Sequence, residues 1–166
     1  MLTLLLMRHA KSDWESSHQS DHDRPLSKRG IKAAGLMGEV LTATDSAPDL
    51  VVTSSAERAR RTAELAHEAG GWSCPVLESD ALYASRPETV LEAVKGLHGE
   101  PSVLLLVGHE PVWSQLLSEL VGGGSFRFPT AAVAAVELAI PTWADLAPGN
   151  GQLLWFVTPR FLTPFQ

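Results

Sequence analysis

The sequence is poor in cysteine and in positive charge. Cys74 is the one cysteine among 166 residues, which excludes an intramolecular disulfide and a zinc site of the all-cysteine kind. On the same ground we expect a reducing, cytoplasmic location. The 13 Lys and Arg residues are outnumbered by 19 Asp and Glu residues, so the net charge is −6. This balance argues against a protein that holds nucleic acid on a broad basic surface.

Long apolar runs are also missing. Residues 1–7 are apolar, but no basic region precedes them and Arg8-His9 ends the run too early for an export signal. No run approaches the roughly 20 residues that span a bilayer, so we expect no membrane association. With 45% hydrophobic and 19% charged residues, the composition indicates a folded protein. The length favours a single domain over residues 1–166.

Short apolar runs alternate with helical patterns along the chain. The sequence Ser-x-x-Glu, which occurs at Ser54 and again at Ser85, is typical of a capping box at the start of a helix. Continuously apolar strands that alternate with helices are typical of a mostly parallel sheet covered on both faces. The pattern therefore predicts an α/β/α three-layer domain with about six strands. Strands are expected at residues 2–7, 50–53, 75–78, 103–107, 131–138 and 152–157, and helices at 25–41, 54–69, 85–97 and 111–120.

Cationic or imidazole side chains follow three of the expected strands. Arg8-His9 follows the first strand, and Arg58 lies in the first turn of the helix after the second. Gly108-His109 follows a third strand. Because ligands of such sheets bind beyond the carboxyl ends of the strands, we expect these side chains to converge there. Arginine forks and helix N-termini both suit phosphate oxygens, so the sequence predicts a local anion pocket.

These residue types suit phosphoryl transfer. A neutral imidazole can attack phosphorus and form a covalent phosphohistidine, while arginines stabilise charge on the transferring group. Such chemistry requires no metal or other cofactor. Taken alone, His9 could be structural, Arg58 a solvated helix charge and Gly108-His109 an ordinary turn. Their coincidence at successive strand ends favours the functional interpretation.

Four segments carry a specific resemblance. They contain Arg8-His9-Ala10, Pro25-Leu26-Ser27, Ser54-Ser55-Ala56-Glu57-Arg58, and Gly108-His109-Glu110, in this order. In this arrangement the chain resembles the histidine phosphatase superfamily, also called the phosphoglycerate mutase-like family. The resemblance implies that His9 is the nucleophile that becomes phosphorylated. It also implies that Arg8, Arg58 and His109 bind the phosphoryl group.

Within that superfamily, the short length and Arg24-Pro25-Leu26 resemble the SixA branch of phosphohistidine phosphatases, as do the stretches 8–14 and 21–26. That resemblance implies removal of phosphate from phosphohistidine on a signalling protein. Many members of the superfamily carry a glutamate that protonates the leaving oxygen, but here no acid follows Leu82. Asp80 and Glu78 are the candidates to replace it. An imidazole leaving group departs more easily than an alkoxide, so a phosphohistidine substrate would need the acid less.

The polar segment after His9 holds two further candidates for substrate binding, Arg24 and Lys11. For each, a solvated loop charge is an equal alternative. The same segment contains a cluster from His18 to Asp23 with metal-ligand chemistry. We interpret that cluster as a solvated loop and expect no metal site, because metal sites need fixed geometry.

Several functions are compatible with the predicted pocket. The first is a metal-independent phosphatase for phosphohistidine on a protein, and the second is a phosphatase for a small phosphorylated metabolite such as a sugar phosphate or nucleotide. A non-catalytic phosphate-binding or interaction module is a third hypothesis, although it would be expected to have lost His9. A mutase needs an acid that the sequence does not place. A small open pocket is compatible with a monomer.

Overall fold

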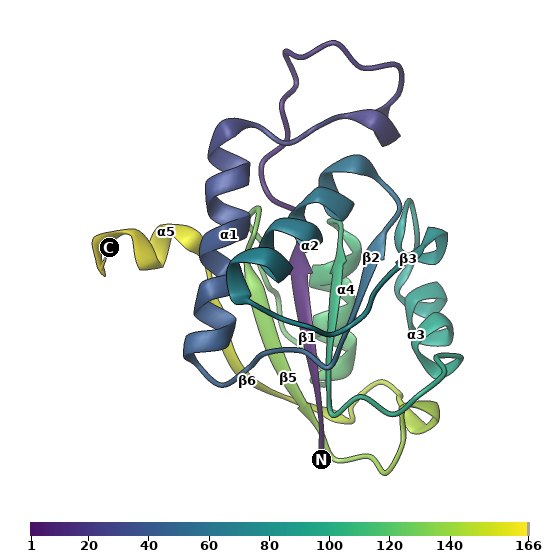
Figure 1. Cartoon of the computed structure of the whole chain (residues 1–166). Coiled ribbons are helices and arrows are strands. Elements are labelled where there is room, and N and C mark those ends of the chain that lie inside the picture. The colour runs from purple at the N-terminus through teal and green to yellow at the C-terminus, as the bar shows by residue number, and fades with distance from the viewer. Residues whose placement is uncertain (166) are drawn as a thin grey trace.

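A six-stranded sheet forms the centre of the computed structural model, which describes residues 1–165 (Figure 1). The strand order is β3-β2-β4-β1-β5-β6. The first four strands in this order are mutually parallel, whereas β5 runs antiparallel to both β1 and β6. The prediction of a mostly parallel sheet of about six strands is thus confirmed. The strands are β1 (Leu2–Arg8), β2 (Leu50–Ser54), β3 (Val76–Ser79), β4 (Val103–Gly108), β5 (Val133–Leu138) and β6 (Gly151–Val157).

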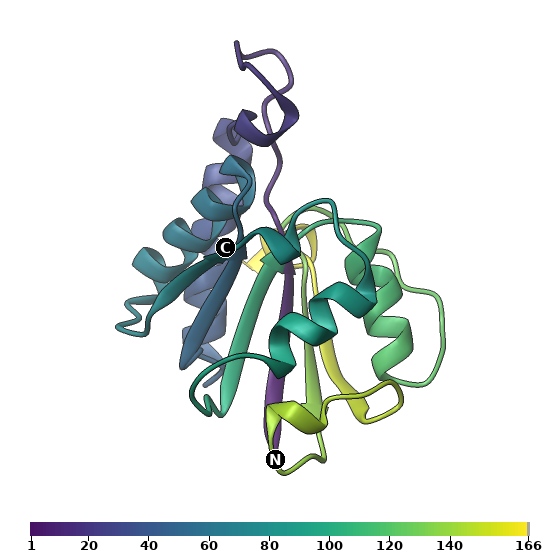
Figure 2. The ribbon, with the colours of Figure 1, turned by 90° about the vertical axis from the view of Figure 1, so that its right-hand side faces the viewer.

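Helices cover both faces of the sheet (Figure 2). Leu4 and Leu6 of β1 pack in one buried cluster with α3 and α4, while Leu5 and Met7 pack in the opposite cluster with α1 and α2. Alternate side chains of a strand point to opposite faces, so a strand covered on both sides must be apolar throughout. This explains the continuous run in β1. The helices are α1 (Lys28–Ala43), α2 (Glu57–Gly70), α3 (Pro87–Lys95), α4 (Val112–Leu120) and the short α5 (Pro159–Leu162), which contacts α1.

Both expected capping boxes are wrong. α2 begins at Glu57 rather than at Ser54, and its N-cap, Ala56, makes no side-chain cap. Ser54 instead ends β2, and its hydroxyl accepts a hydrogen bond from the Ala56 N–H. α3 begins at Pro87, with no cap from the side chain before it. The Ser-x-x-Glu pattern is present in both places. However, Ser54 belongs to β2 and Pro87 is the first residue of α3, so neither serine caps a helix.

Two glycines allow close packing around the end of β1. A Cβ on Gly30 of α1 would collide with the backbone carbonyl of Lys11, so glycine lets the first turn of α1 approach the segment after His9. A Cβ on Gly108 would collide with the ring of Trp113, whose Nε1 donates to the Met7 carbonyl at 2.8 Å. These contacts fix the ends of β1 and β4 relative to the helices.

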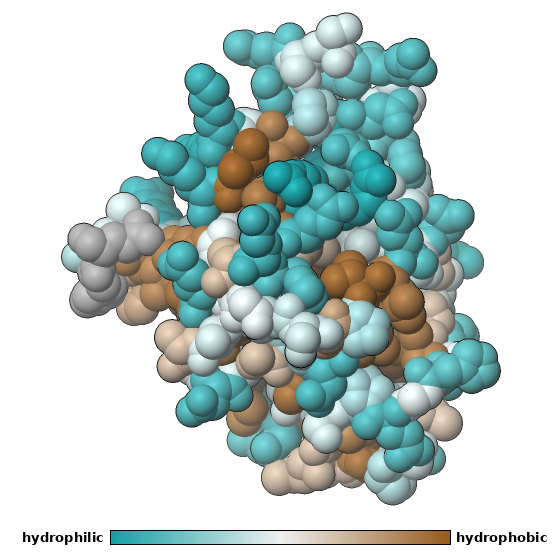
Figure 3. Space-filling model, in the orientation of Figure 1, coloured by the Kyte–Doolittle hydropathy of each residue, from teal (hydrophilic) through white to brown (hydrophobic). Residues whose placement is uncertain are grey.

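Hydrophilic side chains cover most of the face shown in Figure 3. Among residues 1–165, no helix combines the length and the apolarity needed to cross a membrane. At the C-terminal end, α5 is followed by the 3₁₀ turn Thr163–Phe165. Gln166 lies outside the described residues.

Candidate active site

Adjacent ends of β1 and β4 bring His9 and His109 together. The two strands pair in parallel, with Arg8 opposite Gly108, and the His9 N–H donates to the Gly108 carbonyl at 2.9 Å. The next residues along each strand are therefore neighbours, and their ring centroids lie 5.1 Å apart. Both rings are buried. The convergence expected from the strand ends is what the structure shows.

The contacts of His9 leave one nitrogen with a free lone pair. Nδ1 lies 2.7 Å from the Ala10 carbonyl, and because a carbonyl only accepts, Nδ1 carries the proton and donates it. Burial, aided by the nearby positive charges, lowers the pKa of His9 to about 3, so the ring is neutral at pH 7. Nε2 is then unprotonated, as an attack on phosphorus requires.

Hydrogen bonds from two other segments fix the backbone around His9. The Ala131 N–H donates to the carbonyls of Arg8 and His9, and Ala131 has a φ of 61°, a strained conformation for a residue with a side chain. The Ala10 N–H donates to the Thr62 hydroxyl at 2.9 Å. These bonds tie the backbone on both sides of His9 to two other elements.

Two arginines accompany His9, of which Arg8 is half-buried and Arg58 is buried. Arg8 ends β1 and donates from one terminal nitrogen to the Phe128 carbonyl at 2.8 Å, while Arg58 comes from the first turn of α2. The Nε of each arginine is buried and has no hydrogen-bond partner within residues 1–165. Such buried donors are rare in folded proteins unless a ligand meets them. Burial also lowers the pKa of Arg8, which leaves a charged donor poorly solvated.

His109 is oriented by the end of β2. Its Nε2 and the Ser54 hydroxyl share a hydrogen bond of 2.8 Å. Burial is the main reason that the pKa of His109 falls to about 4, and the charge of Arg58 lowers it further. His109 is therefore also neutral at pH 7. The Ser54 hydroxyl, which was expected to cap a helix, is instead hydrogen-bonded to a histidine of the site.

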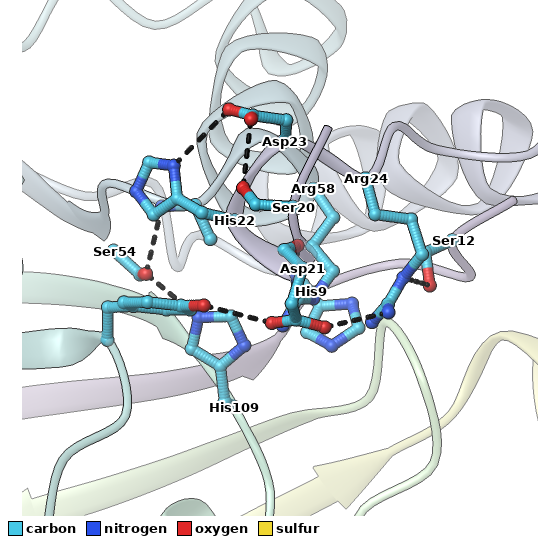
Figure 4. Close-up of polar contacts among 12 residues, drawn as sticks. His9, Ser12, Ser20, Asp21, His22, Asp23, Arg24, Ser54, Arg58 and His109 are labelled. Carbon is cyan, nitrogen blue, oxygen red and sulfur yellow. Dashed lines mark hydrogen bonds and ion pairs between the residues drawn. The ribbon is translucent and has the colours of Figure 1, made fainter. Parts of the chain in front are cut away.

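Asp21 contacts two arginines of the site, Arg24 and Arg58 (Figure 4). Its carboxylate accepts from Arg24 at 2.8 Å and from Arg58 at 3.1 Å, and its carbonyl accepts from Arg58 at 2.7 Å. The interpretation of residues 18–23 as a solvated loop missed this contact. The one available signal was the Asp-x-x-Arg spacing of Asp21 and Arg24 on a short 3₁₀ helix.

Tyr83 is the second site residue that sequence reasoning missed. Its hydroxyl donates to Asp21 at 2.9 Å, and its ring packs edge-on against His109. Burial alone would raise the pKa of Asp21, but the Tyr83 hydrogen bond and the charge of Arg58 outweigh it and lower that pKa. Burial and the bond to Asp21 raise the pKa of Tyr83, so the phenol stays protonated. No sequence signal marked Tyr83.

The two candidate acids lie beside the pocket rather than in it. Asp80 accepts a 2.5 Å hydrogen bond from the Ser55 hydroxyl, which in turn lies 3.1 Å from Nε2 of His22. Glu78 sits on the exposed strand β3, with its carboxylate 3.9 Å from Arg60. Within the described residues, neither carboxylate has a hydrogen bond or ion pair to the histidines and arginines of the pocket.

Arg24 and Lys11 line a cavity of about 330 Å³ over His9. Arg24 is buried, donates to the Ser12 hydroxyl at 3.0 Å and lies 3.5 Å from the ring centroid of Trp14. Lys11 is exposed at the rim. In residues 1–165, no three His, Cys, Asp or Glu side chains are grouped so as to hold a metal ion.

Comparisons with known proteins agree on one family. Residues 4–83 match the model of the histidine phosphatase superfamily, branch 1. The chain is 41% identical to an uncharacterised protein of Mycobacterium tuberculosis in an alignment 164 positions long, which covers 93% of this chain and all of the relative. The range matched by the family model includes both His9 and Arg58.

Solved structures give the same result. One from Nakamurella multipartitia, described as a candidate phosphohistidine phosphatase SixA, is 32% identical, with a TM-score of 0.82 over 95% of this chain and 96% of that one. A second, from Agrobacterium tumefaciens and described in the same way, is 26% identical, with a TM-score of 0.79 over 95% and 98% of the two chains. Fold, site geometry and sequence thus support phosphatase activity, and the chain belongs to the histidine phosphatase superfamily.

Proposed function

We propose that the protein hydrolyses phosphohistidine on another protein through a phosphorylated His9. The observation that carries the proposal is the neutral, buried His9 beside two buried arginine Nε groups without partners. A phosphoryl group bound there would give both donors an anionic acceptor. The SixA-like relatives support the same substrate class. A reducing cytoplasm, inferred from the single cysteine, is part of the proposal.

The reaction takes place in two displacements. In the first, the His9 Nε2 lone pair forms a bond to phosphorus while the bond from phosphorus to the substrate imidazole breaks, and that imidazole leaves with a proton from solvent. In the second, water attacks phosphorus, the bond to His9 breaks and inorganic phosphate is released. Arg8 and Arg58 stabilise the charge on the equatorial oxygens in both steps. His109 binds a phosphoryl oxygen from the opposite side of the pocket.

The position of Asp80 favours a good leaving group. Its carboxylate is bound to Ser55 and has no contact with His9 or His109 in the described residues. An alkoxide leaving group would depend on such an acid, with a contribution of about a hundredfold or more. An imidazole depends on it less, which favours a P–N bond over an alkyl phosphate ester.

Radiolabelled phosphate can identify the intermediate. A peptide carrying labelled phosphohistidine is mixed with the enzyme and quenched, and the protein is digested. We expect acid-labile label on His9 and none in His9→Ala, which loses turnover. His98→Ala changes an exposed histidine far from the pocket and is expected to label normally. Full activity in His9→Ala, or label on another residue, would contradict the mechanism.

A small phosphomonoester is the second candidate substrate. The cavity of about 330 Å³ over His9 falls within the range of small-ligand sites. The two candidates are separated by comparing kcat/KM for a phosphohistidine peptide with that for a panel of sugar phosphates and nucleotides. A clearly higher kcat/KM for one ester would identify that ester as the substrate, and the proposed chemistry at His9 would be unchanged.

A further inference from the structure

A basic groove leads away from the phosphate pocket. We define it by Lys11, Arg29, Arg127 and Arg160, which line a cavity of about 390 Å³ together with Thr130. Lys11, Arg29 and Thr130 also line the cavity over His9, so the two cavities adjoin. A group bound in the groove would therefore be close to a phosphoryl group on its way to His9.

The charge of the groove contrasts with that of the whole chain. Acidic residues exceed basic ones by six, yet no Asp or Glu of the described part of the chain lines either cavity. Each of the four groove cations is exposed and has no hydrogen bond or ion pair from its side chain within residues 1–165. Arg60 and Arg61 of α2, in contrast, pair with Glu57 and Glu64.

The groove is longer than a small ester requires. Past Arg29 and Arg160 it continues between α1 and α5 into an open cavity of about 830 Å³. Lys32 adds another cation there and Glu39 a single anion, while Ile31 and Leu36 add apolar surface. α5 lies beside α1 in Figure 1, and the two helices form the walls of this part. Such an extended, open and cationic path fits a polypeptide better than a compact metabolite.

We propose that the basic groove binds an acidic segment of the phosphorylated protein, next to the residue that enters the pocket. This inference rests on the proposed function, since it specifies the partner of that same site. Exposed cations attract such a segment over several ångströms and set its direction, although each contributes only modest affinity. The protein partner would thus be selected by charge outside the phosphate pocket.

Two phosphohistidine peptides of about twelve residues test the groove. They have the same sequence, except that one carries Asp and Glu beside the phosphohistidine where the other carries Asn and Gln. We expect the acidic peptide to have a KM about tenfold lower with the unmodified enzyme, and the difference to shrink at high salt. In the double variant Arg127→Glu/Arg160→Glu the two peptides should have similar KM values. Hydrolysis of a small aryl phosphate, which does not reach these side chains, reports whether the pocket is intact.

A charge-matched control separates the groove from net charge. Arg61→Glu/Lys95→Glu changes the charge by the same amount at α2 and α3, and it should keep the preference for the acidic peptide. Equal KM values for both peptides with the unmodified enzyme would show that the groove does not bind an acidic segment, and would leave the proposed function unchanged. If the unmodified enzyme hydrolysed the aryl phosphate but neither peptide, both the proposed groove and the proposed function would be wrong. If hydrolysis of a bisphosphorylated sugar depended on Arg127 and Arg160 and hydrolysis of the acidic peptide did not, the ligand of the groove would be a small polyanion and the proposed polypeptide ligand would be wrong.

Discussion

The two sides of the phosphate pocket differ in how their charges are used. On one side Asp21 accepts hydrogen bonds from Arg58 and Tyr83, and Asp80 accepts one from Ser55. On the other side the cations of the basic groove have no partners in the described residues. The acidic side therefore holds groups in place, whereas the basic side is available to a ligand.

This difference refines what net charge can exclude. A net charge of −6 argues against a broad basic surface over the whole protein. It does not exclude a local gradient of charge across one site. His9 and His109 lie between the two sides, so changes on either side are expected to reach the reacting group.

The largest effect is expected from Arg58→Met, which removes the cation that links the acidic side to the pocket. Because Arg58 is buried beside His9 and would contact the phosphoryl group, kcat/KM for an aryl phosphate should fall about a thousandfold. Arg60→Met on the same helix removes a half-buried cation bound to Glu57 and should lower kcat/KM less than twofold. A fall below tenfold in Arg58→Met, with unchanged melting temperature, would remove Arg58 from the phosphate site.

The second expectation concerns the protonation of the two histidines. Burial lowers the pKa of His9 to about 3 and that of His109 to about 4, against about 6.5 for a free imidazole. Imidazole NMR signals of both residues should thus stay in the neutral form from pH 8 to 5.5. Below pH 6.5 the two histidines bind protons in the unfolded chain but not in the folded protein. The free energy of unfolding should therefore fall as the pH falls.

Half-protonation of either ring near pH 6.5 would contradict this expectation. For His109, it would mean that the attraction of Asp21 outweighs burial and the charge of Arg58. Bound phosphate is expected to raise both pKa values, because its negative charge stabilises the protonated rings. A phosphate titration at pH 5.5 therefore provides a direct check on the same samples.

The strand ends were predictable because two general rules act on this sequence. Buried parallel strands are apolar throughout, which locates β1 and β4, and neighbouring parallel strands end at one edge, which brings His9 and His109 together. Ser54 shows the limit of local patterns. The Ser-x-x-Glu motif fits a capping box, but the hydroxyl is engaged by His109 and by the Ala56 N–H.

Asp21 and Tyr83 could not be placed from the sequence for a different reason. Each acts at a distance along the chain: Asp21 meets Arg58, 37 residues later, and Tyr83 meets Asp21 across 62 residues. The segment between β1 and α1 has no apolar periodicity, and its position depends on contacts such as the bridge between Ser12 and Leu26. Composition carries no information on such contacts.

A smaller effect is expected from Asp21→Asn on the acidic side. The substitution removes a negative charge that competes with phosphate for Arg24 and Arg58, so inorganic phosphate should inhibit about fivefold more strongly. The effect is modest because the Asp21 side chain is 53% exposed. Asp23→Asn, a neighbour of similar exposure that pairs with His22, is the matched control and should leave inhibition unchanged. Weaker inhibition in Asp21→Asn would show that the carboxylate serves mainly to orient the arginines.

The smallest effect is expected from Asp80→Asn with a phosphohistidine peptide. Its carboxylate is bound to Ser55, and an imidazole leaving group needs little help, so kcat should change by less than about twofold. Glu78→Gln, on the exposed strand β3, is the matched control among the nearby acids. A hundredfold loss in Asp80→Asn alone would show that a general acid acts even on a P–N bond. The acidic side would then take part in the chemistry, and the contrast between a holding side and a binding side would no longer describe the site.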